Sequence, residues 1–260
     1  EPIKEVKIEK SKFHCNPFYP FIYLCKNNIV FYIGIGSALI AMQTIGLIDI
    51  IVVVISDSFD NMDQSKSNFV ALLTTIGVSL GLILGPVLIL PILKKYFSIF
   101  NTLLICLFIV ILAALGMFSI LIIKTYYIVV IGTFMAGLGY LTFPCYNTIL
   151  MKYTDKDNKG RSNGVVLACQ SIGVTIAPFS YAILYEYLKQ YNMKYMLYLF
   201  SICLTCISLC LTIPLKKHMN KMDESIQENL LLNAEDNESI KGVSYDNRSN
   251  TSLISQDLKI

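Results

Sequence analysis

Six apolar stretches, each long enough to cross a lipid bilayer, take up most of this 260-residue chain. They contain 21 to 27 residues each, whereas about 20 helical residues cross ~30 Å of hydrocarbon. The predicted spans are residues 29–55, 69–93, 103–123, 127–151, 164–187 and 195–215. Only a helix satisfies every backbone group within such a segment, and the alternating signature of barrel strands is missing. The sequence therefore predicts an all-α polytopic membrane protein with a six-transmembrane-helix bundle.

The composition agrees with a chain whose main partner is the lipid bilayer. It is 55% hydrophobic and 15% charged, whereas about a quarter of the residues of a soluble domain are charged. The net charge of +3 is too small and too scattered to indicate a nucleic-acid partner. The spans contain neither paired aspartates nor a His-Glu-x-x-His motif. They therefore lack the side chains that an intramembrane hydrolase requires. We expect no enzymatic activity and no cofactor.

The segments on either side of the bundle differ from it in composition. Residues 1–28 are predicted to be a cytoplasmic loop and an interfacial elbow, because the apolar part is short and contains Pro17 and Pro20. Residues 216–260 are rich in Asn, Ser, Asp and Glu and are predicted to be a disordered cytoplasmic tail. The chain begins with Glu1 rather than methionine, so we expect it to be the back part of a longer protein.

The orientation follows from lysine and arginine in the short loops, which favour the cytoplasmic side. Four such residues lie on one side of the predicted bundle, at Lys66, Lys124, Lys189 and Lys194. Fourteen lie on the other, at Lys4, Lys7, Lys10, Lys12, Lys26, Lys94, Lys95, Lys152, Lys156, Lys159, Arg161, Lys216, Lys217 and Lys221. This asymmetry predicts that both termini are cytoplasmic and that Asp57, Asp60 and Asp63 lie on the opposite side.

Asp49 is the only carboxylate well inside a predicted span. It lies six residues before Ile55, which is roughly 9 Å along a helix. A carboxylate near a helix centre costs about 2.5–3.5 kcal/mol on insertion scales, so it should face a cavity or a partner. Two interpretations stay open: Asp49 contacts substrate or carries a coupling proton, or it is hydrated in a wet outer vestibule.

Three amide side chains are further candidates for a site inside the bundle. Gln43 and Gln170 are expected to point toward the interior, either to bind a solute or to form interhelical hydrogen bonds. Asn147 is four residues before Met151 and is a candidate for either role near the cytoplasmic mouth.

Small residues and prolines predict where helices approach closely or bend. In the second span Gly77, Gly81 and Gly85 recur every four residues and so share one face, and Pro86 follows them. Gly46 and Asp49 share a face of the first span, as Gln170, Gly173 and Ala177 do in the fifth. Pro144 and Pro178 are predicted to interrupt the fourth and fifth spans in a similar way.

Most of the eight cysteines lie inside apolar stretches, where cysteine behaves as a small hydrophobic residue. Cys203, Cys206 and Cys210 share one helix face, but no histidine or carboxylate accompanies them. A soft-metal site needs a complete ligand set, so we expect these residues to pack and predict no metal site.

The glycine and proline spacing of the fifth span resembles a known transporter motif. Gly164, eight residues, Gly173, three residues and Ala177-Pro178 are similar to the antiporter motif of the major facilitator superfamily, with alanine in place of one glycine. That motif belongs to the first half of the family fold, and its position here corresponds by pseudo-symmetry. The second span carries a shorter version in Gly81, three residues and Gly85-Pro86.

Other segments resemble one branch of that family. Asn16-Pro17 and Met42-Gln43-Thr44-Ile45-Gly46 resemble the end of the central loop and the start of the seventh helix of bacterial tetracycline–proton antiporters. Thr142-Phe143-Pro144, followed by Thr154-Asp155-Lys156-Asp157 and Gly160, is similar to the animal hippocampus-abundant-transcript proteins. The loop at Lys94–Ser98 departs from the family pattern, since it lacks the usual acidic residue and glycine.

The resemblance covers residues 16–215 and implies helices seven to twelve of a twelve-helix major facilitator fold with alternating access. It implies a secondary active transporter of a small organic solute, which the chemistry of Asp49 suggests is proton-coupled. Its partners would be the solute, protons, and a missing N-terminal six-helix half or a second copy. The alternative is a truncated six-helix protein with a regulatory role or none in transport. A voltage-gated channel is disfavoured because no span carries a row of arginines.

Overall fold

The computed structural model describes residues 19–58, 64–123 and 126–254, and within these ranges it contains helices and no strands. Six helical segments are long and apolar enough to cross a membrane, which confirms the predicted bundle. They are Asn28–Ile55, Ser65–Tyr96, Ile99–Ser119, Tyr127–Tyr153, Lys159–Gln190 and Met196–Ser225. Lipid-spanning sequence folds this way because each helix satisfies its own backbone hydrogen bonds.

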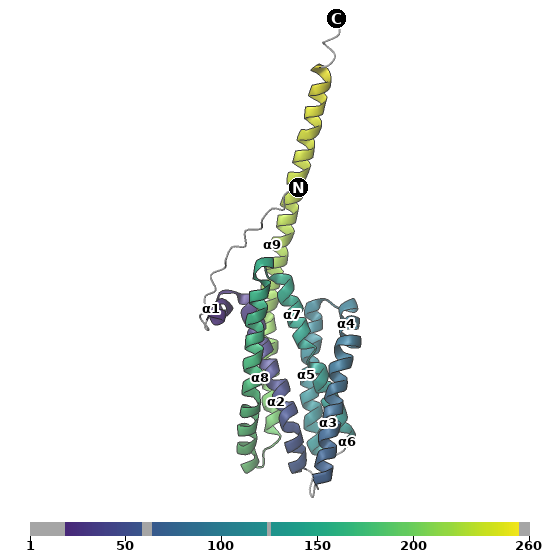
Figure 1. Cartoon of the computed structure of the whole chain (residues 1–260), viewed down its shortest axis with the longest axis vertical. Coiled ribbons are helices and arrows are strands. Elements are labelled where there is room, and N and C mark those ends of the chain that lie inside the picture. The colour runs from purple at the N-terminus through teal and green to yellow at the C-terminus, as the bar shows by residue number, and fades with distance from the viewer. Residues whose placement is uncertain (1–18, 59–63, 124–125, 255–260) are drawn as a thin grey trace, which may run out of the picture. The chain divides into compact units, whose positions relative to one another are not determined.

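The chain divides into two compact units, residues 1–215 and 216–260. The helices are α1 (Tyr19–Lys26), α2 (Asn28–Ser58), α3 (Gln64–Leu84), α4 (Leu90–Tyr96), α5 (Ile99–Ile123), α6 (Tyr126–Gly139), α7 (Thr142–Tyr153), α8 (Lys159–Gln190) and α9 (Met196–Ile254) (Figure 1). A π-helical turn, η1 (Gly85–Ile89), joins α3 to α4, and a 3-10 turn, η2 (Lys156–Asn158), precedes α8. The predicted interfacial elbow overlaps α1, and its part before Tyr19 lies outside the described residues.

Two helix pairs dominate the packing of the first unit. α2 lies along α8, and α3 lies along α6, which also contacts α5 (Figure 1). On α8, one face is buried at intervals of three or four residues, through Cys169, Gly173, Ala177, Tyr181, Tyr185 and Leu188. This periodicity is that of a helix with one side in the core and the other facing outward.

Glycines bring α3 and α6 close together. A Cβ atom built on Gly77 would lie against Thr133 and 2.9 Å from the Val130 carbonyl oxygen, and one on Gly81 would lie 2.8 Å from the Gly137 Cα. Small residues at such interfaces let the two backbones approach and gain dispersion contacts that larger side chains would prevent. The glycine face of the second span is therefore turned toward the fourth span.

Two small residues perform the same role between α2 and α8. Gly46 on α2 lies against the ring of Tyr181, and Gly173 on α8 lies against the Ala38 carbonyl group. Ala177, one turn beyond Gly173, is fully buried. The polar face expected around Gly46 is thus occupied at this point by an aromatic ring of a neighbouring helix.

The prolines have different effects in the three spans. Pro86 lies in η1, where the helix widens for one turn, and such turns accommodate a residue that cannot donate a backbone hydrogen bond. The fourth span breaks at Tyr140–Leu141, and Pro144 follows in the first turn of α7. The prediction for Pro178 is wrong, because α8 continues through it as one helix. Pro178 is exposed, so its ring points away from the packed face.

The second unit differs from the disordered tail predicted for residues 216–260, because α9 continues as a helix to Ile254. Residues 215–241 contain neither glycine nor proline and are rich in Lys, Glu and Leu. These residues favour helix, and the polar composition that indicated disorder does not by itself break one.

Candidate functional site

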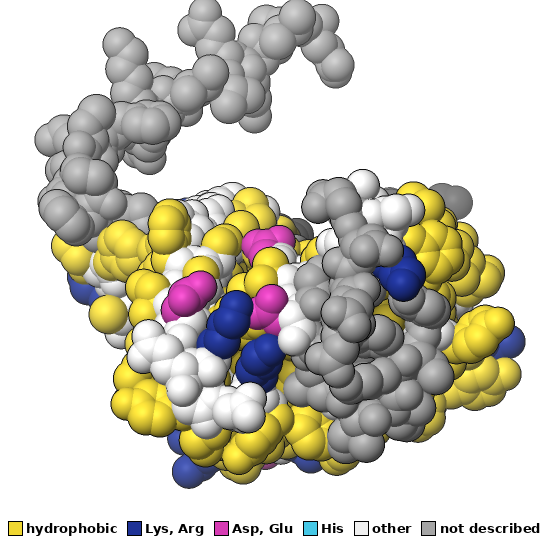
Figure 2. Space-filling view, turned by 90° about the horizontal axis from the view of Figure 1, so that it is seen from below, with side chains coloured by type: hydrophobic (Ala, Val, Ile, Leu, Met, Phe, Trp, Pro, Cys, Tyr) yellow, Lys and Arg dark blue, Asp and Glu magenta, His cyan; other side chains and the backbone are white. Residues whose placement is uncertain are grey.

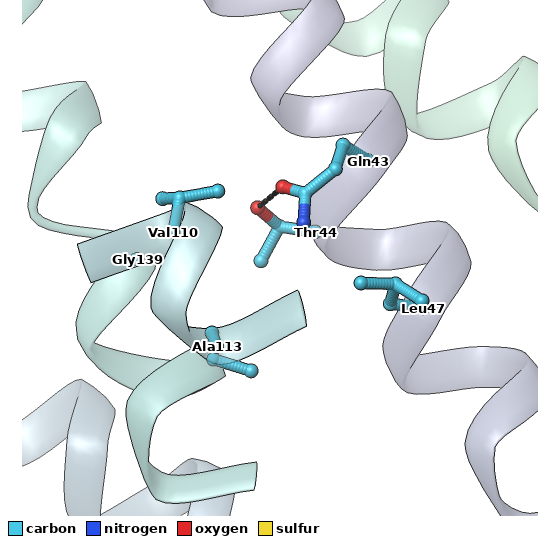
Figure 3. A pocket seen from close by; sticks show the side chains of 7 residues that line it. Gln43, Thr44, Leu47, Val110, Ala113 and Gly139 are labelled. Atoms are coloured by element: carbon cyan, nitrogen blue, oxygen red, sulfur yellow. Dashed lines mark hydrogen bonds between the residues drawn. The ribbon is translucent and has the colours of Figure 1, made fainter. Parts of the chain in front are cut away.

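Gln43 lies in a narrow pocket between α2, α5 and α6 (Figure 3). Its Oε1 accepts a hydrogen bond of 3.0 Å from the Thr44 hydroxyl group, and both residues are 2% exposed. The rest of the lining is apolar, namely Leu47, Val110, Ala113, Ala136 and Gly139. The pocket is too narrow to admit a water molecule. Gln43 is therefore an interior amide, as expected, but in this conformation it is closed off from a solute.

Asp49 lies on a different side of α2 and is exposed. Its carboxylate is close enough to Tyr140, at the turn between α6 and α7, for an electrostatic interaction. The Tyr140 ring in turn stacks at a tilt on Phe143, with ring centroids 5.7 Å apart. Asp49 is thus an exposed acidic group near the break in the fourth span.

Gln170 and Asn147 are half-buried, on α8 and α7 respectively. The Gln170 Nε2 and the Asn147 Oδ1 are both buried and have no hydrogen-bond partner among the described residues. A buried polar atom without a partner costs about 1–3 kcal/mol, so each is an unfilled hydrogen-bonding position. The structure does not gather the four candidates into one pocket, because only Gln43 lines the pocket described above.

Sequence reasoning missed a set of tyrosine and serine hydroxyl groups that connect four helices, α2, α7, α8 and α9. The Tyr146 hydroxyl lies 3.0 Å from the Ser208 Oγ, and Ser208 donates to the Gly36 carbonyl oxygen at 3.2 Å. The Tyr181 hydroxyl lies 2.7 Å from the Ser201 Oγ. The available signal was the recurrence of small hydroxyl residues along one face of α9, at Ser201, Thr205, Ser208 and Thr212.

A second missed group is a charged cluster at the end of the bundle where α2 ends and α8 meets α9. Asp57 Oδ2 accepts hydrogen bonds from the Lys189 Nζ at 2.6 Å and the Tyr185 hydroxyl at 2.5 Å. The Lys194 Nζ donates to the Asp57 carbonyl oxygen at 3.1 Å. Figure 2 views this end and shows lysine and acidic side chains gathered between apolar ones.

The cluster changes the charge state of its carboxyl group. The hydrogen bond from Lys189, supported by the one from Tyr185, holds the pKa of Asp57 below its usual value. Burial of the carboxyl group acts in the opposite direction but is the weaker effect. Asp57 therefore remains ionised and ties the end of α2 to α8 and to the residues before α9. Asp60 and Asp63, the other acidic residues of this predicted loop, lie outside the described residues.

The structure corrects the expectation that Cys203, Cys206 and Cys210 pack in the core. Cys203, Cys206 and Cys210 do share a face of α9, but that face is exposed and does not pack in the core. Cys106 and Cys145, by contrast, are fully buried with their sulfur atoms 3.9 Å apart. Among the described residues, no group of three or more His, Cys, Asp or Glu side chains is arranged to hold a metal ion.

Six apolar membrane-spanning helices, packed through glycines and carrying a few interior polar groups, define a polytopic membrane protein. The chain belongs to the major facilitator superfamily, whose family model matches residues 2–178. It is therefore a multi-pass membrane transporter protein, of a family that is generally non-enzymatic. No curated protein matches the chain.

Proposed function

We propose that this chain supplies helices seven to twelve of a twelve-helix transporter that moves a small organic solute by alternating access, coupled to protons. Asp49 is the coupling carboxylate, and Gln43, Gln170 and Asn147 contribute hydrogen bonds along the solute path. A second six-helix bundle, either an N-terminal half or another copy of the chain, completes the site. The resemblance to tetracycline–proton antiporters and hippocampus-abundant-transcript proteins supports this branch of the family.

The exposure of Asp49 is the observation that carries the proposal. The residue lies inside a membrane span and yet faces outward from this bundle. Contact between a carboxylate and lipid is costly, by up to about 2.5–3.5 kcal/mol at a helix centre and less toward its ends. A second bundle that encloses a water-filled cavity over α2 removes this cost and gives Asp49 access to protons and solute.

The uneven coverage of the spans supports a second bundle as the partner. Within each span, an 18-residue apolar window is 22% buried for Ser65–Tyr96 and 28% buried for Lys159–Gln190, compared with 56% for Asn28–Ile55. The uncovered side of α8 is a continuous apolar stripe formed by Ile172, Ile176, Phe179 and Ile183. Such a stripe suits the surface of another helix bundle as well as it suits lipid, because helix association in membranes depends on packing.

The two ends of the bundle differ in charge, which supports an orientation with the termini in the cytoplasm. Lys94, Lys152 and Arg161 lie at the end where α4 and α7 finish and α8 begins. Lys189 and Lys194 lie at the opposite end and are both engaged by Asp57. The excess of basic residues at the first end agrees with the preference of lysine and arginine for the cytoplasmic side.

The experiment that tests the proposal is proton-driven transport by the full-length protein in proteoliposomes. Uptake of a panel of small organic solutes, including a tetracycline, is measured with and without an imposed pH gradient. We expect at least one solute to accumulate, and Asp49→Asn to abolish the dependence on the pH gradient while facilitated movement of that solute persists. The matched control is Glu186→Gln, which removes an exposed carboxylate from the end of α8.

Two results would count against the proposal in different ways. If Asp49→Asn retains the full pH dependence, the coupling proton is carried elsewhere. If the complete protein contains no second six-helix bundle and the chain is monomeric in mild detergent, this chain does not act as half of a twelve-helix transporter.

A further inference from the structure

Cys106 and Cys145 form a thiol pair that the proposed transport cycle does not use. Cys106 is on α5 and Cys145 is on α7, 39 positions apart in the sequence. Their Sγ atoms lie 3.9 Å apart, both side chains are fully buried, and both thiols are free. A disulfide needs sulfur atoms about 2.05 Å apart. Bond formation therefore requires the two sulfur atoms to approach each other by slightly less than 2 Å.

A lysine side chain lies near the Cys145 end of this pair. Lys94 lies near it, because its Nζ donates a 3.5 Å hydrogen bond to the hydroxyl group of Thr148, which is three residues further along α7. Its charge also interacts electrostatically with Cys145. The thiolate is the nucleophilic form of cysteine; a neighbouring positive charge favours it, and burial opposes it. Cys169, another buried cysteine, lies beside Gly34 of α2 instead.

The position of the pair in the fold gives its oxidation a structural consequence. Cys145 is in the first turns of α7, directly after the break at Tyr140–Leu141 that separates α7 from α6. A covalent bond from Cys145 to α5 would fix this half-helix relative to the rest of the bundle. The same break carries Tyr140, the neighbour of Asp49.

We propose that Cys106 and Cys145 are a redox-sensitive dithiol that a lipid-soluble hydroperoxide converts to a disulfide, tying α7 to α5. The Cys145 thiolate attacks the terminal peroxide oxygen and becomes a sulfenic acid, and the peroxide leaves as an alcohol after taking up the thiol proton. The Cys106 sulfur then attacks the Cys145 sulfur, and water leaves. In sum, two thiols and one hydroperoxide give one disulfide, one alcohol and one water; the thiols lose two electrons and the O–O bond gains them.

The test uses the full chain in native membranes treated with tert-butyl hydroperoxide, which enters the bilayer. Remaining thiols are blocked, the protein is digested without reducing agent, and the peptides are identified by mass spectrometry. We expect one linked pair containing Cys106 and Cys145, two hydrogen atoms lighter than the sum of its peptides and separated by dithiothreitol. The melting temperature should rise after oxidation and return after reduction, because the new bond closes a long loop.

The exposed residue Cys25 reports whether the reagent has acted. Cys145→Ser should abolish the linked peptide and leave Cys106 as a free thiol, whereas Cys169→Ser should leave the link intact. The proposal fails if Cys25 is oxidised while Cys106 and Cys145 of the unaltered protein are recovered as separate thiols. It also fails if either forms its main link with another cysteine. These readouts involve no transported solute, so they are independent of the proposed transport function.

Discussion

The contact between α3 and α6 offers the sharpest test of the fold, through the substitution Gly81→Ala. The added methyl group would lie 2.8 Å from both the Gly137 Cα and the Leu138 nitrogen, and still closer to the Phe134 carbonyl oxygen. All three atoms belong to the backbone of α6, so no side chain can rotate away. The methyl group can be accommodated only if the two helices separate.

The size of the effect follows from these distances. Ordinary contact begins at 3.4 Å, so the helices must move apart by at least 0.6 Å, the difference between 3.4 and 2.8 Å. Overpacking of this kind costs about 1–3 kcal/mol. Alanine also improves helix propensity by up to about 1 kcal/mol relative to glycine. A control substitution that gains the same propensity without the clash isolates the packing cost.

Gly164→Ala provides that control, because Gly164 is also in a helix and a Cβ atom there would meet nothing within 4 Å. We expect Gly81→Ala to be less stable than Gly164→Ala by about 1–3 kcal/mol. This difference equals the full overpacking cost, because both variants gain the same helix propensity. At about 2–4 °C per kcal/mol for a domain of this size, the two melting temperatures should differ by several degrees.

The assay is thermal unfolding in detergent micelles, followed by a fluorogenic thiol reagent that reacts with buried cysteines as they become accessible. Gly137→Ala, on the facing side of the contact, should be destabilising too, and the double variant should cost less than the sum because the helices are already separated. Equal melting temperatures for Gly81→Ala and Gly164→Ala would refute the close approach of α3 and α6.

Two further predictions concern the ends of the bundle. Asp57→Asn should lower the melting temperature at neutral pH by weakening the tie to Lys189, whereas Glu186→Gln should have little effect. Because the pKa of Asp57 is lowered from 3.8, its contribution is complete above that value and is lost as the pH falls through the lower folded-state pKa. The difference between Asp57→Asn and the unaltered protein should therefore shrink only below pH 3.8, and a constant difference would contradict the role of the carboxylate. In a Cys15→Ser background, a membrane-impermeant maleimide should label the exposed Cys25 only after cells are permeabilised; labelling of intact cells would reverse the proposed orientation.

The number of membrane spans could be predicted from the sequence because it depends on local properties. A run of about 20 apolar residues must be helical in lipid, whatever surrounds it. The predicted span 29–55 and the observed Asn28–Ile55 differ by one residue at one end. Local composition predicted two other features less well. α8 is continuous through Pro178, and the polar residues after Leu215 are helical.

The candidate site depended more on tertiary structure than the positions of the membrane spans did. The sequence identified Asp49 and Gln43 as costly in lipid, since the cost of burying a polar group belongs to the residue itself. It could not assign Gln43 to a closed pocket and Asp49 to an open face, because those environments are made by residues of α5, α6 and α7.

The sequence alone thus determined which segments cross the membrane and which polar residues require an explanation. Only the tertiary structure decided which groups meet: Asp57 with Lys189, Tyr146 with Ser208, and Cys106 with Cys145. The physical reason is that hydropathy is summed along one segment, whereas a hydrogen bond or a thiol contact depends on the rotation and depth of two helices. Those are set by interhelical packing, and here by where glycines let backbones approach.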